Sequence, residues 1–580
     1  MKHKEKRMIQ DYFLSTMKLL LEADEDSKKL LSDIFEPRDV AVPPDDAWRS
    51  LLVTRQGYIR CYGEYYSNKT DQNGRVCYIE SRDAGLSWRT RFPSNKNALG
   101  ASAYVPFLDK YCAMRSVEGK GTFFYTADSP DDTPEEIFVC TTEFIDFRLP
   151  IPLRSKNRII VIAHERRPEE HPTCFFALLL ISDDGGKTFK IVRLQGAPYY
   201  ERASENEGVR WQQNNRENTI EELSDGTLLM FSRTATNFHY TTRSHDCGDT
   251  WEENRPSVFH STGTMPLLKR LSDGRILFFW CNTQLLPELP EADGLWEDVF
   301  TNRDASHCAI SEDEGKSWLG FREFRLNELR NYPDFRSIGG ILPNLLDKSV
   351  HQFEALELPL GKVLVVSGQG FMLRRVTIFD VRWLYEKSRE EDFLGGMQNI
   401  SCQVYLKSVL GGYRGAGYAG HCAYNRLPGA AMLPNPVKKW REALYLTSLN
   451  DRRLIGREAG AVWNFPAATR GEVCVRARIT GQALRVTLLD RWLNPCDPTL
   501  KNDSASFIFG SAATGDFYDY AISFDTAKGV AECVVNGKTI VKKLPAFPVG
   551  VSYVHLQIVS DDENDGAEGA YISHLAFQAK

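Results

Sequence analysis

One eight-residue pattern recurs four times in this chain of 580 residues, and it constrains the fold more than any other feature. The pattern reads Ser-x-Asp-x-Gly-x-(Ser or Thr)-aromatic, and its copies, which we call the four boxes, are Ser81–Trp88, Ser182–Phe189, Ser244–Trp251 and Ser311–Trp318. Serine and aspartate side chains cap backbone amides in turns, and glycine accepts a positive φ. Each box is therefore interpreted as a turn between two strands rather than as a catalytic motif.

The spacing of the boxes predicts repeated β units. Their central aspartates, Asp83, Asp184, Asp246 and Asp313, stand 101, 62 and 67 residues apart. The first interval is long enough to hold one more unit, whose box has decayed around Thr126–Glu136. Units of this length, with several strands and a fixed hairpin turn, are typical of propeller blades.

A second motif predicts hairpins inside these units. The segments Glu222–Phe231, Arg270–Phe279 and Glu357–Val366 each end one apolar run at Asp-Gly or an equivalent pair and then begin another. A tight turn between two apolar runs is typical of neighbouring antiparallel strands. We therefore expect each of these segments to join the inner two strands of one unit.

The two ends of the chain have residue patterns that differ from those of the middle. Residues 8–35 carry apolar residues at helical spacing, which predicts one or two helices packed on the main body. After about residue 440 the boxes stop, and period-two runs with an Asn536-Gly537 turn predict a separate antiparallel β-sandwich of the jelly-roll, lectin-like kind. The expected fold is all-β, with a helical extension over 1–44, a propeller over 45–438 and the sandwich over 439–580.

Composition narrows the function classes. The net charge of −6 gives no basic footprint for nucleic acid, and no apolar span of about 20 residues is present to cross a membrane. The 13 cysteines include no CxxC pair, which favours reduced thiols and a cytoplasmic protein without a signal peptide. There is no HExxH spacing and no phosphate-binding loop, so neither a metal nor another cofactor is expected.

Residues outside the boxes carry a family resemblance. In the middle of the chain, "ENTIEELSDGTLLMFSRT" places Glu217 before an Asp-Gly hairpin and Arg233 at the end of the next strand. Near the start, "WRSLLVTRQG" contains Arg49, and Arg303 lies eight residues before the fourth box. Over about residues 45–435 this order resembles the Asp-box (BNR) repeats of the sialidase, or neuraminidase, superfamily, whose members are six-bladed propellers.

The resemblance implies a chemistry for these side chains. Arg49, Arg233 and Arg303 would clamp the carboxylate of an acidic sugar through charge-assisted hydrogen bonds. Asp71, which lies 22 residues after Arg49 and 10 before the first box, matches the general acid of the family. Glu217 matches the carboxylate that takes a proton from a tyrosine nucleophile.

The tyrosine itself departs from the family pattern. The stretch "QFEALELPLG" has Gln352 where the family has its nucleophilic tyrosine. Tyrosines elsewhere that could reach the site are Tyr332, Tyr413, Tyr418 and Tyr424. Three alternatives stay open: a tyrosine from another loop, direct attack by water with Glu217 as the base, or a related acidic sugar as substrate. His351, beside Gln352, is expected to be a packed residue.

The sequence thus predicts an exo-acting glycoside hydrolase that releases a terminal sialic acid or related 2-keto sugar acid from a glycan. A hydrolase or lyase of another acidic sugar is one alternative. A non-catalytic propeller that binds glycans is the other, because an arginine at a propeller strand end often serves only in an ion pair between blades. A glycan or acidic sugar is the expected partner, nucleic acid and membrane are not, and a homo-oligomer is left open.

Overall fold

The computed structural model describes residues 8–43, 51–62, 77–172, 174–201, 212, 215–283, 303–331, 349–368, 374–405, 426–448, 460–493, 505–511, 515–559 and 569–580. Helices α2 (Met8–Glu22) and α3 (Glu25–Ser32) come first, which confirms the predicted helical segment. Asp24 caps α3 by accepting the Ser27 N–H at 3.1 Å. Among the described residues, no helix is long and apolar enough to cross a membrane.

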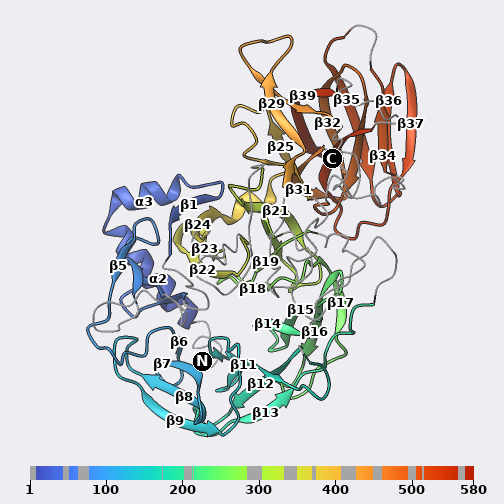
Figure 1. Cartoon of the computed structure of the whole chain (residues 1–580). Coiled ribbons are helices and arrows are strands. Elements are labelled where there is room, and N and C mark those ends of the chain that lie inside the picture. The colour runs from blue at the N-terminus through green and yellow to red at the C-terminus, as the bar shows by residue number, and fades with distance from the viewer. Residues whose placement is uncertain are drawn as a thin grey trace.

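Six four-stranded antiparallel sheets follow in the described part of the chain, and we number them in chain order (Figure 1). Sheet 1 holds β2 (Leu51–Val53), β3 (Ile59–Tyr62), β4 (Tyr78–Ser81) and β5 (Arg89–Arg91), and sheet 2 holds β6 (Ala103–Val105), β7 (Lys110–Val117), β8 (Gly121–Ala127) and β9 (Glu135–Cys140). Sheet 3 holds β10 (Ile151–Pro152), β11 (Ile159–Arg166), β12 (Phe175–Ser182) and β13 (Lys190–Arg193), and sheet 4 holds β14 (Arg216–Glu222), β15 (Leu228–Arg233), β16 (Phe238–Ser244) and β17 (Arg255–His260). Sheet 5 holds β18 (Leu267–Arg270), β19 (Ile276–Trp280), β20 (Ala305–Ser311) and β21 (Leu319–Leu326). Sheet 6 holds β22 (Glu354–Leu358), β23 (Lys362–Ser367), β24 (Arg375–Asp380) and, from the other end of the chain, β1 (Arg38–Ala41).

These sheets pack face to face around a ring (Figure 1). Each pair of successive sheets shares a cluster of buried apolar side chains, such as Phe231 of sheet 4 with Phe278 of sheet 5, whose rings lie 4.7 Å apart. A further cluster joins sheet 1 to sheet 6 through Ile59 and Leu364, so the ring is continuous. β1 pairs with β24 and ties the N-terminal part of the chain into the last sheet. The arrangement is consistent with the predicted sialidase-like propeller.

The boxes are turns, as predicted. Each one joins the third strand of a sheet to the fourth, in sheets 1, 3, 4 and 5. In the first box, Ser81 Oγ accepts the Gly85 N–H at 2.8 Å and Asp83 accepts the Ser87 N–H at 2.9 Å. The same two hydrogen bonds recur in the other three boxes at 2.8–2.9 Å. Sheet 2 has its third-to-fourth connection at residues 128–134, where the decayed box was expected.

The C-terminal strands form two larger antiparallel sheets. One contains β25 (Ser388–Glu391), β29 (Ala430–Pro434), β30 (Glu442–Leu446), β32 (Arg470–Ile479), β35 (Tyr518–Asp525), β36 (Val530–Val535), β37 (Lys538–Lys543) and β39 (Ala570–Ala579). The other contains β26 (Ile400–Ser401), β31 (Gly460–Ala468), β33 (Ala483–Leu489), β34 (Ser506–Phe509) and β38 (Val551–Val559). A single buried cluster lies between them, in which Phe465 stacks on Phe577 with ring centroids 4.3 Å apart. β27 (Gln403–Tyr405) and β28 (Arg426–Pro428) pair separately, and two short 3-10 turns, η1 (Pro359–Gly361) and η2 (Val381–Tyr385), follow β22 and β24.

Strand pairing does not follow the predicted boundaries at residues 44 and 438. β25 and β26 precede residue 438, yet they pair with β39 and β31 of the C-terminal sheets. β1 precedes residue 44, yet it belongs to sheet 6. Partners in a sheet are separated by long stretches of sequence at both places, so local periodicity could not reveal them.

Buried polar contacts join the C-terminal sheets to sheet 5. The Tyr553 hydroxyl of β38 donates to Glu323 Oε1 of β21 at 2.5 Å and accepts from His307 Nε2 of β20 at 2.6 Å. Asn464 of β31 accepts the Glu323 N–H at 3.0 Å and donates to Phe321 O at 3.1 Å. The two parts of the molecule therefore share a hydrogen-bonded interface. Figure 1 shows β21 beside β31 at this place.

Candidate functional site

Strand order places the described candidate residues at the same end of the strands in their sheets. In a four-stranded antiparallel sheet, the start of the first strand, the end of the second and the start of the third lie at the same end of the strands. Glu217 lies at the start of β14, Arg233 at the end of β15, Arg303 two residues before β20 and Gln352 two residues before β22. The boxes join the third strand to the fourth, so they lie at the opposite end of the strands. The predicted catalytic and binding residues thus lie at the opposite end of the strands from the boxes whose spacing identified them.

Glu217 and Arg233 meet as an ion pair. The distance from Arg233 Nη1 to Glu217 Oε2 is 2.8 Å, and both side chains are buried. The pairing of β14 with β15 shifts register between Arg216 and Thr219, and Glu217 sits in this bulge with φ at +52°. A bulge interrupts the alternation of side chains along a strand and re-aims one of them. The backbone therefore turns the carboxylate towards the guanidinium at the end of β15.

His164 of sheet 3 and Arg148, from the segment that precedes this sheet, hold the Glu217 backbone on both sides. The Glu217 N–H donates to His164 Nε2 at 3.0 Å, and Arg148 Nη2 donates to Glu217 O at 3.2 Å. Because His164 Nε2 accepts, its Nδ1 carries the proton and donates to Asp146 O at 3.3 Å. A left-handed backbone at a non-glycine residue costs about 1–3 kcal/mol and persists only where its surroundings fix it. His164 and Arg148 supply that support.

A neighbouring ion pair fixes the start of β14. Arg216 Nη2 donates to Asp146 Oδ2 at 2.8 Å, and the Arg216 guanidinium lies 4.2 Å from the centroid of the Phe175 ring. The sequence prediction missed His164, Arg148 and Asp146. One signal was available for His164, because it is a polar residue that follows the apolar run "IIVIA". No local pattern linked it to Glu217, which is 53 residues further along the chain.

Arg303 and Gln352 form a second group, between sheets 5 and 6. Arg303 is buried, with Nη2 donating to Gly263 O at 3.0 Å and Nη1 lying 3.5 Å from His351 Nε2. His351 is fully buried, as predicted. Gln352 has φ at +72°, and its buried Oε1 has no hydrogen-bond partner among the described residues. The position of the expected tyrosine thus lies beside the expected third arginine.

The segment between β17 and β18 connects the two groups. Ser261 N–H donates to Asn237 O at 2.8 Å, just beyond the end of β15 that carries Arg233. Two residues further on, Gly263 O accepts from Arg303. Near Arg233, burial together with the positive guanidinium lowers the pKa of His239 to about 3. His239 is therefore neutral and donates from Nδ1 to Ser232 O at 3.2 Å.

Several predicted residues lie outside the described part of the chain. They are Arg49, Asp71, Tyr332, Tyr413, Tyr418 and Tyr424. The general acid, the first arginine and the alternative nucleophiles consequently stay predictions. Among the predicted site residues, the structure describes Glu217, Arg233, Arg303 and Gln352.

A large cleft of about 1190 Å³ lies elsewhere, between sheets 5 and 6 and the C-terminal sheets. Its lining includes Arg322, Arg330 and Glu386 but none of the predicted site residues. Arg322 Nη1 is 2.5 Å from Glu386 Oε2, and Arg330 donates to the carbonyls of Gln398 and Ile400 at 2.6 and 2.7 Å. The Arg330 contacts join sheet 5 to the C-terminal part of the molecule, so we assign the cleft a structural role.

Comparisons with known proteins leave the family open. No protein-family model matches the sequence, and no curated protein matches it. A Trypanosoma rangeli sialidase in complex with sialic acid aligns at 10% identity, covering 94% of this chain and 91% of the sialidase, with a TM-score of 0.33. A protein of unknown function from Dyadobacter fermentans aligns at 15% identity over 60% of this chain and 96% of its own, with a TM-score of 0.33. A structure named sialidase aligns at 12% identity over 94% of this chain and 49% of its own, with a TM-score of 0.24. At these TM-scores the alignments carry no argument about activity.

Proposed function

We propose that this protein is an exo-acting glycoside hydrolase of the sialidase type, which releases a terminal acidic sugar from a glycan. In this proposal sheets 1 to 6 are the blades of a six-bladed propeller, and the two C-terminal sheets form a β-sandwich. The observation that carries the proposal is the buried ion pair between Glu217 and Arg233. The sequence motif predicts both residues as members of one site, with Arg233 in the carboxylate clamp and Glu217 as a proton acceptor.

The proposed roles follow from the charge of the substrate. Arg233 and Arg303, with Arg49, bind the sugar carboxylate, and their positive charge persists while an oxocarbenium-like transition state develops on the ring. Arg233 also holds the Glu217 carboxylate at 2.8 Å, and His164 and Arg148 fix the backbone behind it. Asp71 donates the proton to the leaving oxygen.

For the attacking group we propose water, with Glu217 as proton acceptor. Gln352 carries no hydroxyl, so the position expected for the nucleophile cannot form the covalent intermediate of the family. Direct attack by water inverts the anomeric carbon, whereas a covalent intermediate retains its configuration. Proton NMR of the first released anomer separates these routes: inversion supports water, and retention would assign the attack to a tyrosine outside the described residues.

The test of the function is hydrolysis of fluorogenic sugars. We expect the protein to release methylumbelliferone from its α-sialoside and not from the matching β-galactoside, because the galactoside lacks a carboxylate. Release from a glucuronide alone would move the assignment to another acidic sugar. Release from none of the three substrates would contradict the hydrolase proposal.

A second candidate is a glycan-binding protein without turnover, and the absence of a hydroxyl at Gln352 favours it. Such a protein would bind a sialoside without releasing its aglycone. It would also keep its affinity when Asp71 is changed to Asn, because a general acid contributes to the reaction and not to binding of the ground state. The same holds for a hydrolase, so turnover separates the two candidates: calorimetric binding of a non-hydrolysable sialoside without release of methylumbelliferone from the fluorogenic sialoside would indicate the binding protein.

A further inference from the structure

The two most exposed large apolar side chains of the described residues lie on neighbouring loops of the C-terminal part. Trp440 is 79% exposed and Leu394 is 71% exposed, and Val437 adds a third apolar side chain at 56%. Single exposed apolar residues are ordinary, whereas a group that includes a nearly fully exposed tryptophan marks a surface for interaction. We call the surface formed by Leu394 and residues 437–441 the hairpin tip.

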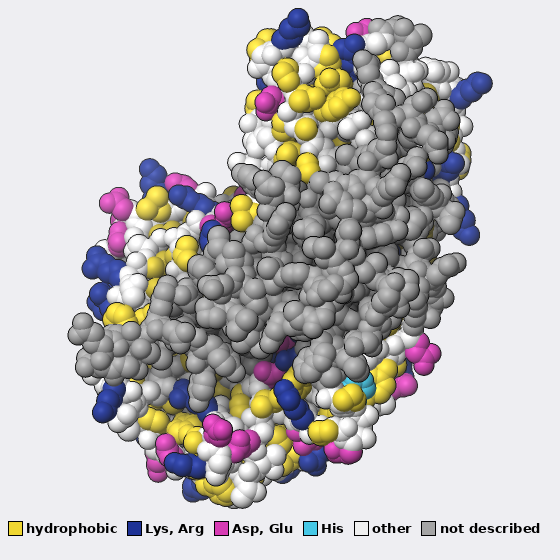
Figure 2. Space-filling model, in the orientation of Figure 1, with side chains coloured by type: hydrophobic (Ala, Val, Ile, Leu, Met, Phe, Trp, Pro, Cys, Tyr) yellow, Lys and Arg dark blue, Asp and Glu magenta, His cyan; other side chains and the backbone are white. Residues whose placement is uncertain are grey.

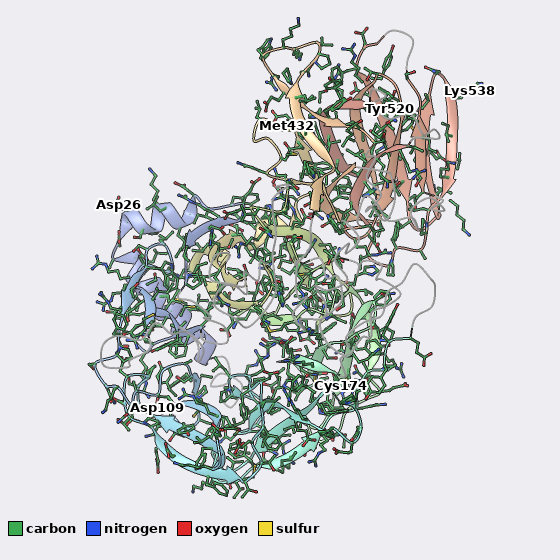
Figure 3. All side chains as sticks on the ribbon, viewed as in Figure 1. Asp26, Asp109, Cys174, Met432, Tyr520 and Lys538 are labelled. Atoms are coloured by element: carbon green, nitrogen blue, oxygen red, sulfur yellow. The ribbon has the colours of Figure 1, made fainter. Side chains whose placement is uncertain are left out.

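Strand pairing brings the two loops together. β25 and β30 both pair with β39, and Glu391 lies opposite Leu575 while Leu444 lies opposite Ile572. The loop that leaves β25 therefore starts close to the point where β30 begins. An ion pair of 3.8 Å between Arg441 and Asp392 joins the loops directly. Figure 3 labels Met432, which lies on β29, the strand that leads to the hairpin tip.

Hydrogen bonds hold the loop between β29 and β30 in one shape. Asn435 Oδ1 accepts the N–H groups of Val437 and Lys438 at 3.0 and 2.9 Å, and the Asn435 N–H donates to Arg441 O at 2.8 Å. The backbone polar groups in this turn are thus satisfied locally. Val437 and Trp440 are consequently displayed outward by an ordered turn and are not needed for packing.

Charged side chains lie beside the apolar ones, positive at Lys438, Lys439 and Arg441 and negative at Asp392 and Glu442. Lys438 and Lys439 are exposed and precede Trp440 directly, and the Arg441 guanidinium lies 5.5 Å from the centroid of the Trp440 ring. In Figure 2 dark blue and yellow atoms gather together at the upper end of the molecule, where the hairpin between β29 and β30 lies. Arg441 is paired with Asp392, so the two lysines supply the exposed positive charge.

We propose that the hairpin tip binds the headgroup region of an anionic lipid bilayer. Tryptophan favours the boundary between headgroups and acyl chains, because its ring is apolar and its indole N–H remains hydrogen-bonded. Lysines beside it are attracted to anionic headgroups. The inference does not depend on the glycosidase proposal. It differs from the sequence prediction, which excluded a membrane by searching for one long apolar span and not for a surface built from two loops.

A protein partner could also use exposed apolar side chains, but the charge pattern favours the lipid. Association of two copies would place the lysines of one tip against those of the other, where like charges repel. An anionic bilayer instead offers negative charge next to an apolar layer, which matches Lys438 and Lys439 beside Trp440.

Co-sedimentation with lipid vesicles tests the proposal on the full chain. We expect binding to vesicles of phosphatidylcholine with about 30% phosphatidylserine, weak binding to phosphatidylcholine alone, and loss of binding at high salt. Trp440→Ala should weaken binding about tenfold and Lys438→Ala/Lys439→Ala about thirtyfold. Val534→Ala is the matched control, because Val534 is 64% exposed on β36, away from β29 in the sheet order, and should bind like the wild type.

Melting temperatures of all variants should match the wild type, because the changed side chains are exposed. Equal binding of wild type and Trp440→Ala, or no binding to anionic vesicles, would overturn the proposal. Concentration-dependent dimerisation that Trp440→Ala abolishes, without vesicle binding, would overturn it in favour of a second copy.

Discussion

Two buried glutamates in this molecule have very different surroundings. Glu217 pairs with Arg233 at the edge of sheet 4 that the sequence motif predicts as a site. Glu323 accepts a 2.5 Å hydrogen bond from Tyr553 where sheet 5 meets the C-terminal sheets. A tyrosine beside a glutamate is the pair that a sialidase nucleophile would need. Yet Tyr553 has no exposed surface, so substrate cannot reach it.

The comparison shows that residue chemistry alone does not define a site. Burial raises the pKa of both Glu323 and Tyr553, and burial lowers the pKa of His307 to about 3. Neutral His307 and the Tyr553 hydroxyl form a hydrogen-bonded chain with Glu323, which suits an interface. Glu217 instead lies beside a guanidinium, in a bulge where backbone strain is maintained by neighbouring residues. Strain of that kind persists only where the surrounding structure fixes it.

Replacing Arg233 should have the largest effect. Arg233→Ala removes a positive charge from the proposed carboxylate clamp and leaves Glu217 without its partner. We expect kcat/KM for a sialoside to fall about 10²–10³-fold. Arg255→Ala, at an exposed arginine of the same sheet, is the control and should retain full activity. Unchanged kcat/KM in folded Arg233→Ala would place the clamp elsewhere.

Replacing Tyr553 should affect stability and not chemistry. Tyr553→Phe removes the hydroxyl that joins His307 to Glu323 and leaves two buried polar groups unsatisfied. The free energy of unfolding should fall by about 1–3 kcal/mol, measured by urea denaturation. The activity of the folded fraction should stay the same. If kcat fell sharply with stability intact, Tyr553 would belong to the catalytic machinery after all.

Substitution of His164 tests whether its hydrogen bond to the Glu217 N–H positions the carboxylate. His164→Leu removes the acceptor of the Glu217 N–H at a strained position, and we expect a loss of about tenfold, mainly in kcat. His164→Gln keeps an acceptor and should recover most of the activity. Equal activities of the Leu and Gln variants would show that the hydrogen bond does not position the carboxylate.

Buried histidines predict a pH dependence of stability in both regions. The folded pKa values of His239 and His307 are about 3, against about 6.5 in an unfolded chain. The unfolded state therefore binds more protons between pH 3 and 6.5, and stability falls as the pH drops below about 6.5. Each histidine should remove about 1 kcal/mol between pH 6.5 and 5.5. Thermal melts of His239→Gln over this range should show a weaker dependence, and an unchanged slope would exclude its contribution.

Local patterns predicted the repeating parts of the molecule well. The boxes and the Asp-Gly hairpins are confirmed as turns. They could be predicted because their capping groups lie within eight residues of one another. The absence of a box in sheet 6 follows from its fourth strand, β1, which comes from the N-terminal part of the chain. The Glu217–Arg233 contact was also predictable, since the two residues flank one hairpin.

Contacts between distant segments could not be predicted. His164 supports Glu217 from sheet 3 and Arg148 supports it from the segment before that sheet, while Tyr553 reaches Glu323 across 230 residues. The strands that pair across the predicted boundaries also have partners far along the chain. We propose that the propeller comprises residues 38–385 and that the C-terminal sheets begin at Ser388, where β25 joins β39. Limited proteolysis that yields a stable fragment ending near residue 386 would support this division.

In the proposed function, Arg233 recognises the carboxylate of an acidic sugar. The most direct measurement compares kcat/KM for a methylumbelliferyl sialoside and its carboxyl methyl ester, with wild-type protein and with Arg233→Ala. The ester removes the substrate charge, and the variant removes the protein charge. We predict that the wild type favours the free acid by about 10²-fold or more, and that Arg233→Ala loses this preference. A preference of equal size in both proteins would contradict the account.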